Sequence, residues 1–283
     1  MNQSFNFGRW WLLVTKHWYE NRRKYTLSLL AIAGLLLAWF AFIVFINPYE
    51  PIDPSMQFGT YYFGLFLIGC LYASMLFAEL ASMPKGINFL SVPASHLEKL
   101  LCALLYGLIV FFITYTIIFY LVELPMIKLS DLVAQAHWKK LLYKSGNFHE
   151  ADVINVFVMP DRPAGAPNVF IYFLLGYFAL QGAFMLGSVY FPKFSLIKSV
   201  IALTLAFALY GFLVGQVFHS IMPAGNFYHG LSGYNFYAND DYASGKVVQL
   251  PDWVNGGMEF ILKYAFAPIF WITTYYRLKE KEI

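Results

Sequence analysis

Long apolar runs alternate with short polar connections along this chain, and the alternation predicts helices that cross a lipid bilayer. The hydrocarbon core of a bilayer, about 30 Å thick, requires roughly 20 apolar residues of helix. The runs are apolar on every face, which is typical of helices buried in lipid or in a bundle. Six segments of this kind are residues 25–46, 60–77, 100–121, 169–191, 199–220 and 254–276.

The composition agrees with this pattern. Of the 283 residues, 59% are hydrophobic and only 12% are charged, whereas soluble domains carry about 25% charged residues. We therefore expect an all-α, polytopic membrane protein whose single domain, residues 1–283, has six transmembrane helices. Cys70 and Cys102 both fall in apolar runs, which favours small buried hydrophobic residues over a disulfide or a metal site. The first residues lack the order of a cleavable signal peptide.

Basic residues gather on alternate connections, and this asymmetry predicts the orientation. The first outer connection, residues 47–59, has no Lys or Arg, whereas both terminal segments and residues 85–99 and 193–198 are basic. Lys and Arg favour the cytoplasmic side, and long loops such as residues 123–168 count less. We therefore expect both termini in the cytoplasm and the chain in the cytoplasmic (inner) membrane.

Residues 7–21 are predicted to form an amphipathic helix that lies in the membrane interface before the first span. Large apolar side chains recur there near helical spacing, while charged residues fall elsewhere on the helix. The apolar positions are Phe7, Trp10, Trp11, Val14 and Trp18. The alternative is a basic flank that happens to contain tryptophans.

Two connections on the predicted outer side are long, residues 123–168 and 221–256. The first contains an amphipathic stretch, residues 130–144, with Ser130 as a plausible N-cap, and then a β-like run, residues 153–159. The second is rich in Gly, Asn, Tyr and Asp, which predicts an irregular cap.

Catalytic and phosphate-binding motifs are absent from the sequence. There is no GxxxxGK[ST] loop, no GxSxG motif and no metal-ligand spacing of histidines. We therefore expect no catalytic, cofactor-binding or metal-binding residues, and any use of ATP would depend on a partner. Ionisable residues are almost missing from the predicted span interiors, which argues against an ion-coupled transporter.

Polar and small residues inside the spans offer two further candidates. Gln181 and Gln216 could line a transport pathway, although a glutamine in a bundle more often hydrogen-bonds a neighbouring helix. Gly211 and Gly215 form a GxxxG motif, which allows close helix packing within one subunit or between two.

The connection between the second and third spans, residues 78–99, is longer than a simple turn needs. It reads AELASMPKGINFLSVPASHLEK. The residues of interest are Gly86, Leu90, Pro93, Ser95, Glu98 and Lys99. This pattern predicts an ordered cytoplasmic segment that a partner protein could bind.

The order of these residues resembles the coupling segment in the membrane subunit of ABC-2 type ABC transporters. The six spans, cytoplasmic termini and interfacial helix also resemble that family, although residues 83–85 replace its usual charged run. The resemblance implies a permease subunit that works with a separate ATP-binding subunit and a second permease subunit, as a homodimer or heterodimer. The apolar spans favour a lipid-like or amphipathic substrate, and nothing indicates a nucleic-acid partner.

Other functions remain open from the sequence. The main alternative is a membrane scaffold, assembly or sensory component that uses its outer loops as a binding face. A membrane enzyme acting on lipid is disfavoured because no acidic or histidine cluster is evident, and a secondary transporter is disfavoured by the apolar spans. Association with an ATP-binding subunit would separate the permease from the scaffold.

Overall fold

The computed structural model describes residues 5–140, 150–160, 169–191, 193–221, 226–230, 233–237, 246–249, 253, 256–257 and 260–281. Its longer helices are α1 (Phe7–Ile46), α2 (Pro54–Met75), α5 (Phe111–Lys140), α6 (Phe170–Tyr190), α7 (Ser195–Ile221) and α9 (Phe266–Lys279). The short helical elements are η1 (Ala78–Ala81), α3 (Met83–Ser91), α4 (His96–Leu104), η2 (Leu105–Val110) and η4 (Ile261–Ala265). The strands are β1 (Asn226–Gly230), β2 (Gly233–Tyr237) and β3 (Lys246–Gln249).

Five helices are long and apolar enough to cross a membrane, which makes the chain a multi-pass helical membrane protein. They are α1, α2, the continuous helix His96–His137, α6 and the Ser195–Leu213 part of α7. Six such helices were expected. The predicted sixth run, residues 254–276, is described only in part, by η4 and α9, and is not among the five.

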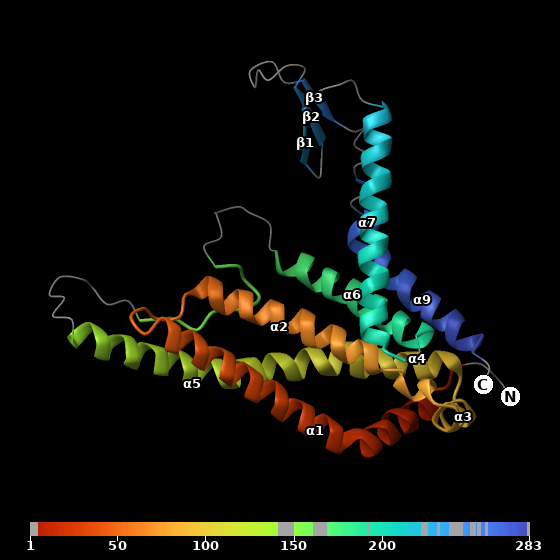
Figure 1. Ribbon diagram of the computed structural model, residues 1–283. Helices are drawn as coiled ribbons and strands as arrows, with labels where there is room; N and C mark the ends of the chain where they lie inside the picture. The colour runs from red at the N-terminus through yellow and green to blue at the C-terminus, as the bar shows by residue number, and fades with distance from the viewer. Residues whose placement is uncertain are drawn as a thin grey trace.

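The N-terminal region forms one helix where two were predicted. Residues 7–21 and 25–46 belong to the single 40-residue helix α1. No Gly or Pro occurs between Arg9 and Ala33, so nothing in the sequence interrupts the backbone hydrogen bonds at the predicted boundary. Residues 7–21 are instead the first part of a helix that bends (Figure 1), and Val14 within them is buried against Cys102 and Tyr106.

The third predicted span is much longer than expected. Helix α4, the π-helical turn η2 and α5 are continuous, and they run through Pro125 into the region predicted as an outer loop. The 42 residues His96–His137 correspond to about 63 Å of helix, roughly twice a hydrocarbon core. Ser130, predicted to cap a new helix, instead lies inside α5, where its hydroxyl accepts from the backbone N–H of Ile52.

The predicted β-like run, residues 153–159, is not part of any described strand, and it contains a turn in which the backbone N–H of Val158 donates to the carbonyl of Asn155. Side chains of α2 and α5 hold it against the bundle. The Gln57 amide donates to the carbonyl of Asp152, and the hydroxyls of Tyr62 and Tyr120 donate to the carbonyls of Val156 and Ile154. These bonds replace the ladder hydrogen bonds that a strand would need.

The core of the bundle is built largely from aromatic rings. Helix α1 packs on α4 and α5, α2 packs on α6, and α6 packs on α9. The most deeply buried rings include Phe40, Tyr61, Phe119 and Tyr177, and edge-to-face contacts such as Tyr61 on Phe119 connect the helices. At Gly69, a Cβ atom would lie 2.9 Å from the Tyr177 ring, so glycine is what lets α2 and α6 approach this closely.

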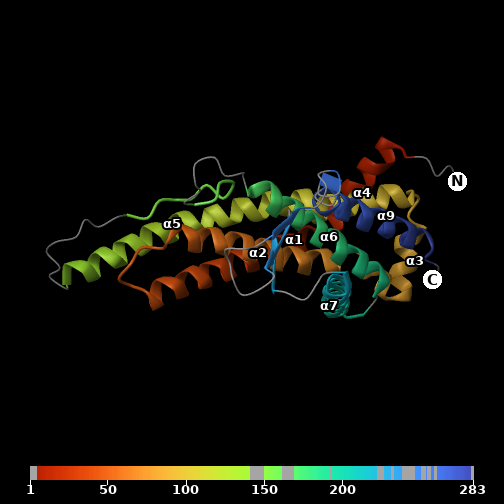
Figure 2. The ribbon, with the colours of Figure 1, turned by 90° about the horizontal axis from the view of Figure 1, so that it is seen from above.

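Helix α7 packs on α6 and α2 near its start and then leaves the bundle, and the small sheet lies beyond it (Figure 1). Figure 1 shows α7 crosswise to α1, α2 and α5, and Figure 2 shows it end-on. Within residues 221–256, predicted as an irregular cap, β1, β2 and β3 form an antiparallel sheet, so the fold departs from a purely helical one.

Candidate functional site

The segment 78–99 folds as η1 and α3 and then turns into α4. It lies at the end of the bundle where the chain also begins and ends (Figure 1). Because this segment carries six of the predicted functional residues, it is the candidate site.

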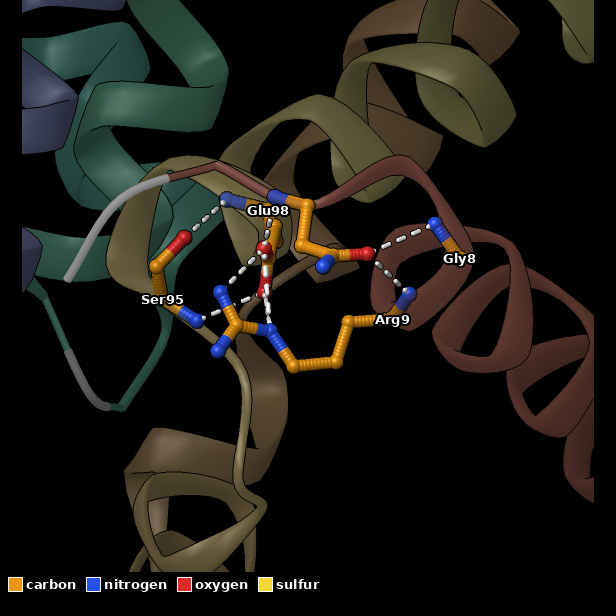
Figure 3. A network of polar contacts seen from close by, with 5 residues as sticks. Gly8, Arg9, Ser95 and Glu98 are labelled. Atoms are coloured by element: carbon orange, nitrogen blue, oxygen red, sulfur yellow. Dashed lines mark hydrogen bonds and ion pairs between the residues drawn. The ribbon is translucent and has the colours of Figure 1, made fainter. Parts of the chain in front are cut away.

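Glu98 is the centre of a buried polar network. Its side chain is 0% exposed. Oε1 accepts from the backbone N–H of Asn6 at 2.8 Å and from Nη2 of Arg9 at 2.7 Å. Oε2 accepts from the backbone N–H of Ser95 at 2.8 Å, and Nε of Arg9 reaches both oxygens at 3.2 Å. Figure 3 shows these contacts, with the Arg9 side chain folded back onto the carboxylate. We call Asn6, Arg9, Ser95 and Glu98 the Glu98 junction.

Two helix N-termini meet at this junction. Asn6 caps α1, since its side-chain oxygen accepts from the backbone N–H groups of Gly8 and Arg9. Ser95 and Glu98 form a capping box at the start of α4. The positive end of each helix dipole therefore faces the carboxylate, and with the guanidinium of Arg9 these charges stabilise the ionised form of Glu98.

Lys99, the next residue in α4, contacts a third helix, α3. It is buried, and its Nζ donates to the carbonyl of Leu90 at 3.0 Å and lies 5.3 Å from the centre of the Phe89 ring. Leu90 is in the last turn of α3, where a cation satisfies free carbonyls and the negative end of the dipole. Glu98 and Lys99 thus join α1, α3 and α4 through two adjacent side chains.

The other predicted residues of the segment divide between an inner and an outer face. Gly86 is buried, and Leu90 packs beside a cluster that includes Leu80, Leu100 and Leu278. Pro93 is exposed at the turn between α3 and α4. Most of the predicted set therefore faces the bundle.

The exposed face of α3 carries apolar residues that the sequence reasoning had not selected. Met83 and Ile87, one helical turn apart, are 71% and 54% exposed. Lys85 is exposed beside them. An amphipathic α3 packs its inner face on the bundle and offers this apolar outer face for a further contact.

The two predicted glutamines have different surroundings. Gln181 is buried in α6, and its amide donates to the carbonyl of Gly69 and to the hydroxyl of Tyr177, both at 3.0 Å. Gln216 is exposed on α7. Gln181 is therefore a packing residue that joins α6 to α2, and the structure does not bring the two side chains together.

Gly211, in the glycine motif of α7, has no close neighbour among the described residues. A Cβ atom added there would meet nothing within 4 Å. Gly215 lies outside the residues whose surroundings the structure describes. Close packing at Gly211 would therefore require a neighbour from outside this chain.

Two kinds of residue were missed by the sequence reasoning. Asn6 and Arg9 hold Glu98 but lie about 90 residues from it in the chain, and no local pattern links them. Glu123 was assigned to an outer loop, yet it is fully buried in α5 and neither carboxylate oxygen has a partner among the described residues. Its position inside an apolar run that continues to Ile127 was the available indication.

Comparison with known proteins does not assign a family. No family model matches the chain, and no curated protein or solved structure matches it. Within the described residues no group of three or more His, Cys, Asp or Glu side chains could hold a metal ion. The functional argument therefore rests on the geometry of the site.

Proposed function

We propose that this chain is the membrane subunit of an exporter of the ABC-2 type, driven by a separate ATP-binding subunit. The observation that carries the proposal is that Glu98 and Lys99, adjacent in α4, bond to α1 and to α3 respectively. These bonds fix a short peripheral helix, α3, to two long helices that are apolar enough to cross a membrane. A force applied to α3 would reach α1 and α5 through buried contacts, since close-packed elements move as units.

The ATP-binding subunit docks on the outer face of α3 in this proposal. Met83 and Ile87 supply the apolar contact, and Lys85 supplies a charge at its edge. Glu98 and Lys99, which the resemblance assigned to partner coupling, transmit the movement within the chain because both are buried.

The membrane arrangement follows from the charges and from the exposed helix. Both termini and α3 face the cytoplasm, and residues 254–276 complete a sixth span. Helix α7 is exposed along most of its length, and a second permease subunit covers it around Gly211. Small residues at such positions permit close helix contact.

A lipid-like or amphipathic substrate suits the described spans. Charged residues in spans mark ion and proton pathways because they are costly in hydrocarbon. Between Tyr25 and Ile46 and between Phe170 and Tyr190 the helices contain none. The long helix His96–His137 does contain charged residues, among them the buried Glu123.

Co-purification of the tagged chain from its native membrane tests the proposal. An ATP-binding protein should be recovered at equal stoichiometry, and Met83→Asp/Ile87→Asp should abolish the recovery while membrane insertion persists. The matched control is Val153→Asp/Val158→Asp, a pair of comparably exposed apolar residues outside α3. Recovery of the chain without an ATP-binding protein would refute the permease.

A scaffold or sensory component is the second candidate. The antiparallel sheet β1–β3 supports it, because an ordered element outside the bundle can serve as a binding face. Under this function, deletion of residues 226–249 would remove a partner in the same co-purification, and the α3 variants would change nothing.

A further inference from the structure

A charged cavity lies between the first part of α1 and the segment 78–92. It has a volume of about 350 Å³. Its charged and titratable lining residues are Lys16, His17, Glu20, Lys24, Glu79 and Lys85. Lys16 and Glu20 pair with each other at 3.7 Å. Lys24 and Lys85 have no ion-pair partner among the described residues, so the lining carries a net positive charge even with Glu79 present.

An apolar cavity of about 270 Å³ lies on the next turns of the same helices. It forms because α1 packs on α4 and α5 while α2 packs on α6, which leaves a groove between α1 and α2. Its walls include Ala31, Ile32, Leu71 and Met75, and Phe111 lies on its floor. Most of its lining residues are apolar, which suits an acyl chain.

The two cavities follow one another along both helices. On α1, residues 13–24 line the charged cavity and residues 18–32 line the apolar one. On the α2 side, Leu76 borders the charged cavity and Met75 borders the apolar one. His17 hydrogen-bonds Tyr25 where the two linings meet. A cationic mouth above an apolar groove matches an amphipathic molecule with an anionic head.

We propose that these cavities hold an anionic phospholipid from the leaflet on the α3 side of the membrane. Lys24 and Lys85 contact its phosphate, and the groove between α1 and α2 takes an acyl chain. Basic pockets between transmembrane helices bind such headgroups, and both cavities are close to the size of ordinary ligand sites. The inference does not rest on the proposed transport function, because the lipid would be retained without an ATP-binding partner.

Native mass spectrometry of the full chain tests the headgroup contact. The chain is released from nanodiscs that contain phosphatidylglycerol, phosphatidylethanolamine and phosphatidylcholine in equal parts. Phosphatidylglycerol should be retained in preference. Lys24→Gln/Lys85→Gln should weaken its retention about thirtyfold, since each of the two lysines near a membrane surface contributes roughly 1 kcal/mol and 1.4 kcal/mol is tenfold. The matched control, Lys193→Gln/Lys198→Gln, removes two exposed lysines at the same end of the bundle and should change nothing.

A second pair of variants tests the acyl groove. Ala31→Trp fills the groove and should abolish retention, whereas Ala38→Trp, on the same helix but outside both cavities, should not. Inorganic phosphate added in excess should fail to displace the lipid, because the acyl chain supplies much of the binding. Equal retention of the three lipids, equal losses in the site and control variants, or full displacement by phosphate would each overturn the proposal.

Discussion

Replacing Glu98 by glutamine should loosen the starts of α1 and α4 together. The substitution keeps the size of the side chain but removes its charge, and it turns one acceptor oxygen into an NH₂ donor. That donor would face the backbone N–H of Ser95 or the guanidinium of Arg9, which are donors themselves. At least one hydrogen bond is therefore lost, and the rest lose their charge assistance.

The expected magnitude follows from burial. Removing one partner of a fully buried ion pair costs about 3–5 kcal/mol. Glu98 is 0% exposed but Arg9 is 33% exposed, so water relieves part of the charge left on the guanidinium. We expect a loss of about 2–3 kcal/mol in the free energy of local opening, so that the open state becomes roughly thirtyfold to 150-fold more populated.

Hydrogen–deuterium exchange of the detergent-solubilised chain measures this opening. Amides in residues 8–13 and 97–102 should exchange faster in Glu98→Gln, while those of α6 keep their rates. The control is Glu20→Gln, which breaks the Lys16–Glu20 pair on the same helix. Both side chains of that pair are at least half exposed, so its removal should change exchange by about twofold or less.

A double-mutant cycle decides whether Arg9 and Glu98 act as a pair. Arg9→Gln and Glu98→Gln should show a coupling energy of at least about 1 kcal/mol, well above the roughly 0.5 kcal/mol expected of independent sites. Additive effects, or exchange that rises only in α4, would refute the idea that this carboxylate joins the two helices.

Three further substitutions test other contacts of the fold. Lys99→Met should speed amide exchange throughout α3 and leave the start of α1 unchanged, since the two contacts it removes, with the Leu90 carbonyl and the Phe89 ring, both lie in α3. Gly69→Val should lower the melting temperature by several degrees, because the valine side chain would overlap the Tyr177 ring. Overpacking of this kind costs about 1–3 kcal/mol. An unchanged melting temperature would contradict the close contact of α2 and α6. Gln57→Leu should make residues 150–160 sensitive to limited proteolysis, because the amide no longer holds that segment, and persistent resistance would show that the tyrosine contacts suffice.

The apolar runs placed the helices well because a bilayer sets strict demands on local sequence. A crossing helix needs about 20 apolar residues, and its backbone groups must bond within the helix. Residues 169–191 and 199–220 were predicted, and α6 and α7 cover nearly the same ranges. Helix α2 begins earlier than residues 60–77 suggested, since Asp53 caps it and Pro54 starts it.

Helix continuity was harder to predict because polar residues do not by themselves end a helix. The boundary expected near Tyr25 and the loop expected after residue 121 both lie inside continuous helices. Helix α5 continues through Pro125, because neighbouring packing can satisfy the groups that a proline frees. The strands of residues 226–249 were missed because a Gly- and Asn-rich segment carries little alternation.

The sequence by itself determined that this is a helical membrane protein with an ordered segment at residues 78–99, since composition and apolar length act locally. Only the tertiary structure decided which way the polar residues of that segment face. The S-x-x-E pattern of Ser95 and Glu98 marks a helix start in any protein, but the partner, Arg9, is 89 residues away. Gln181 and Gln216 look alike in sequence, yet one is buried and one is exposed. Contacts between distant segments depend on how the helices pack, and no local pattern records that packing.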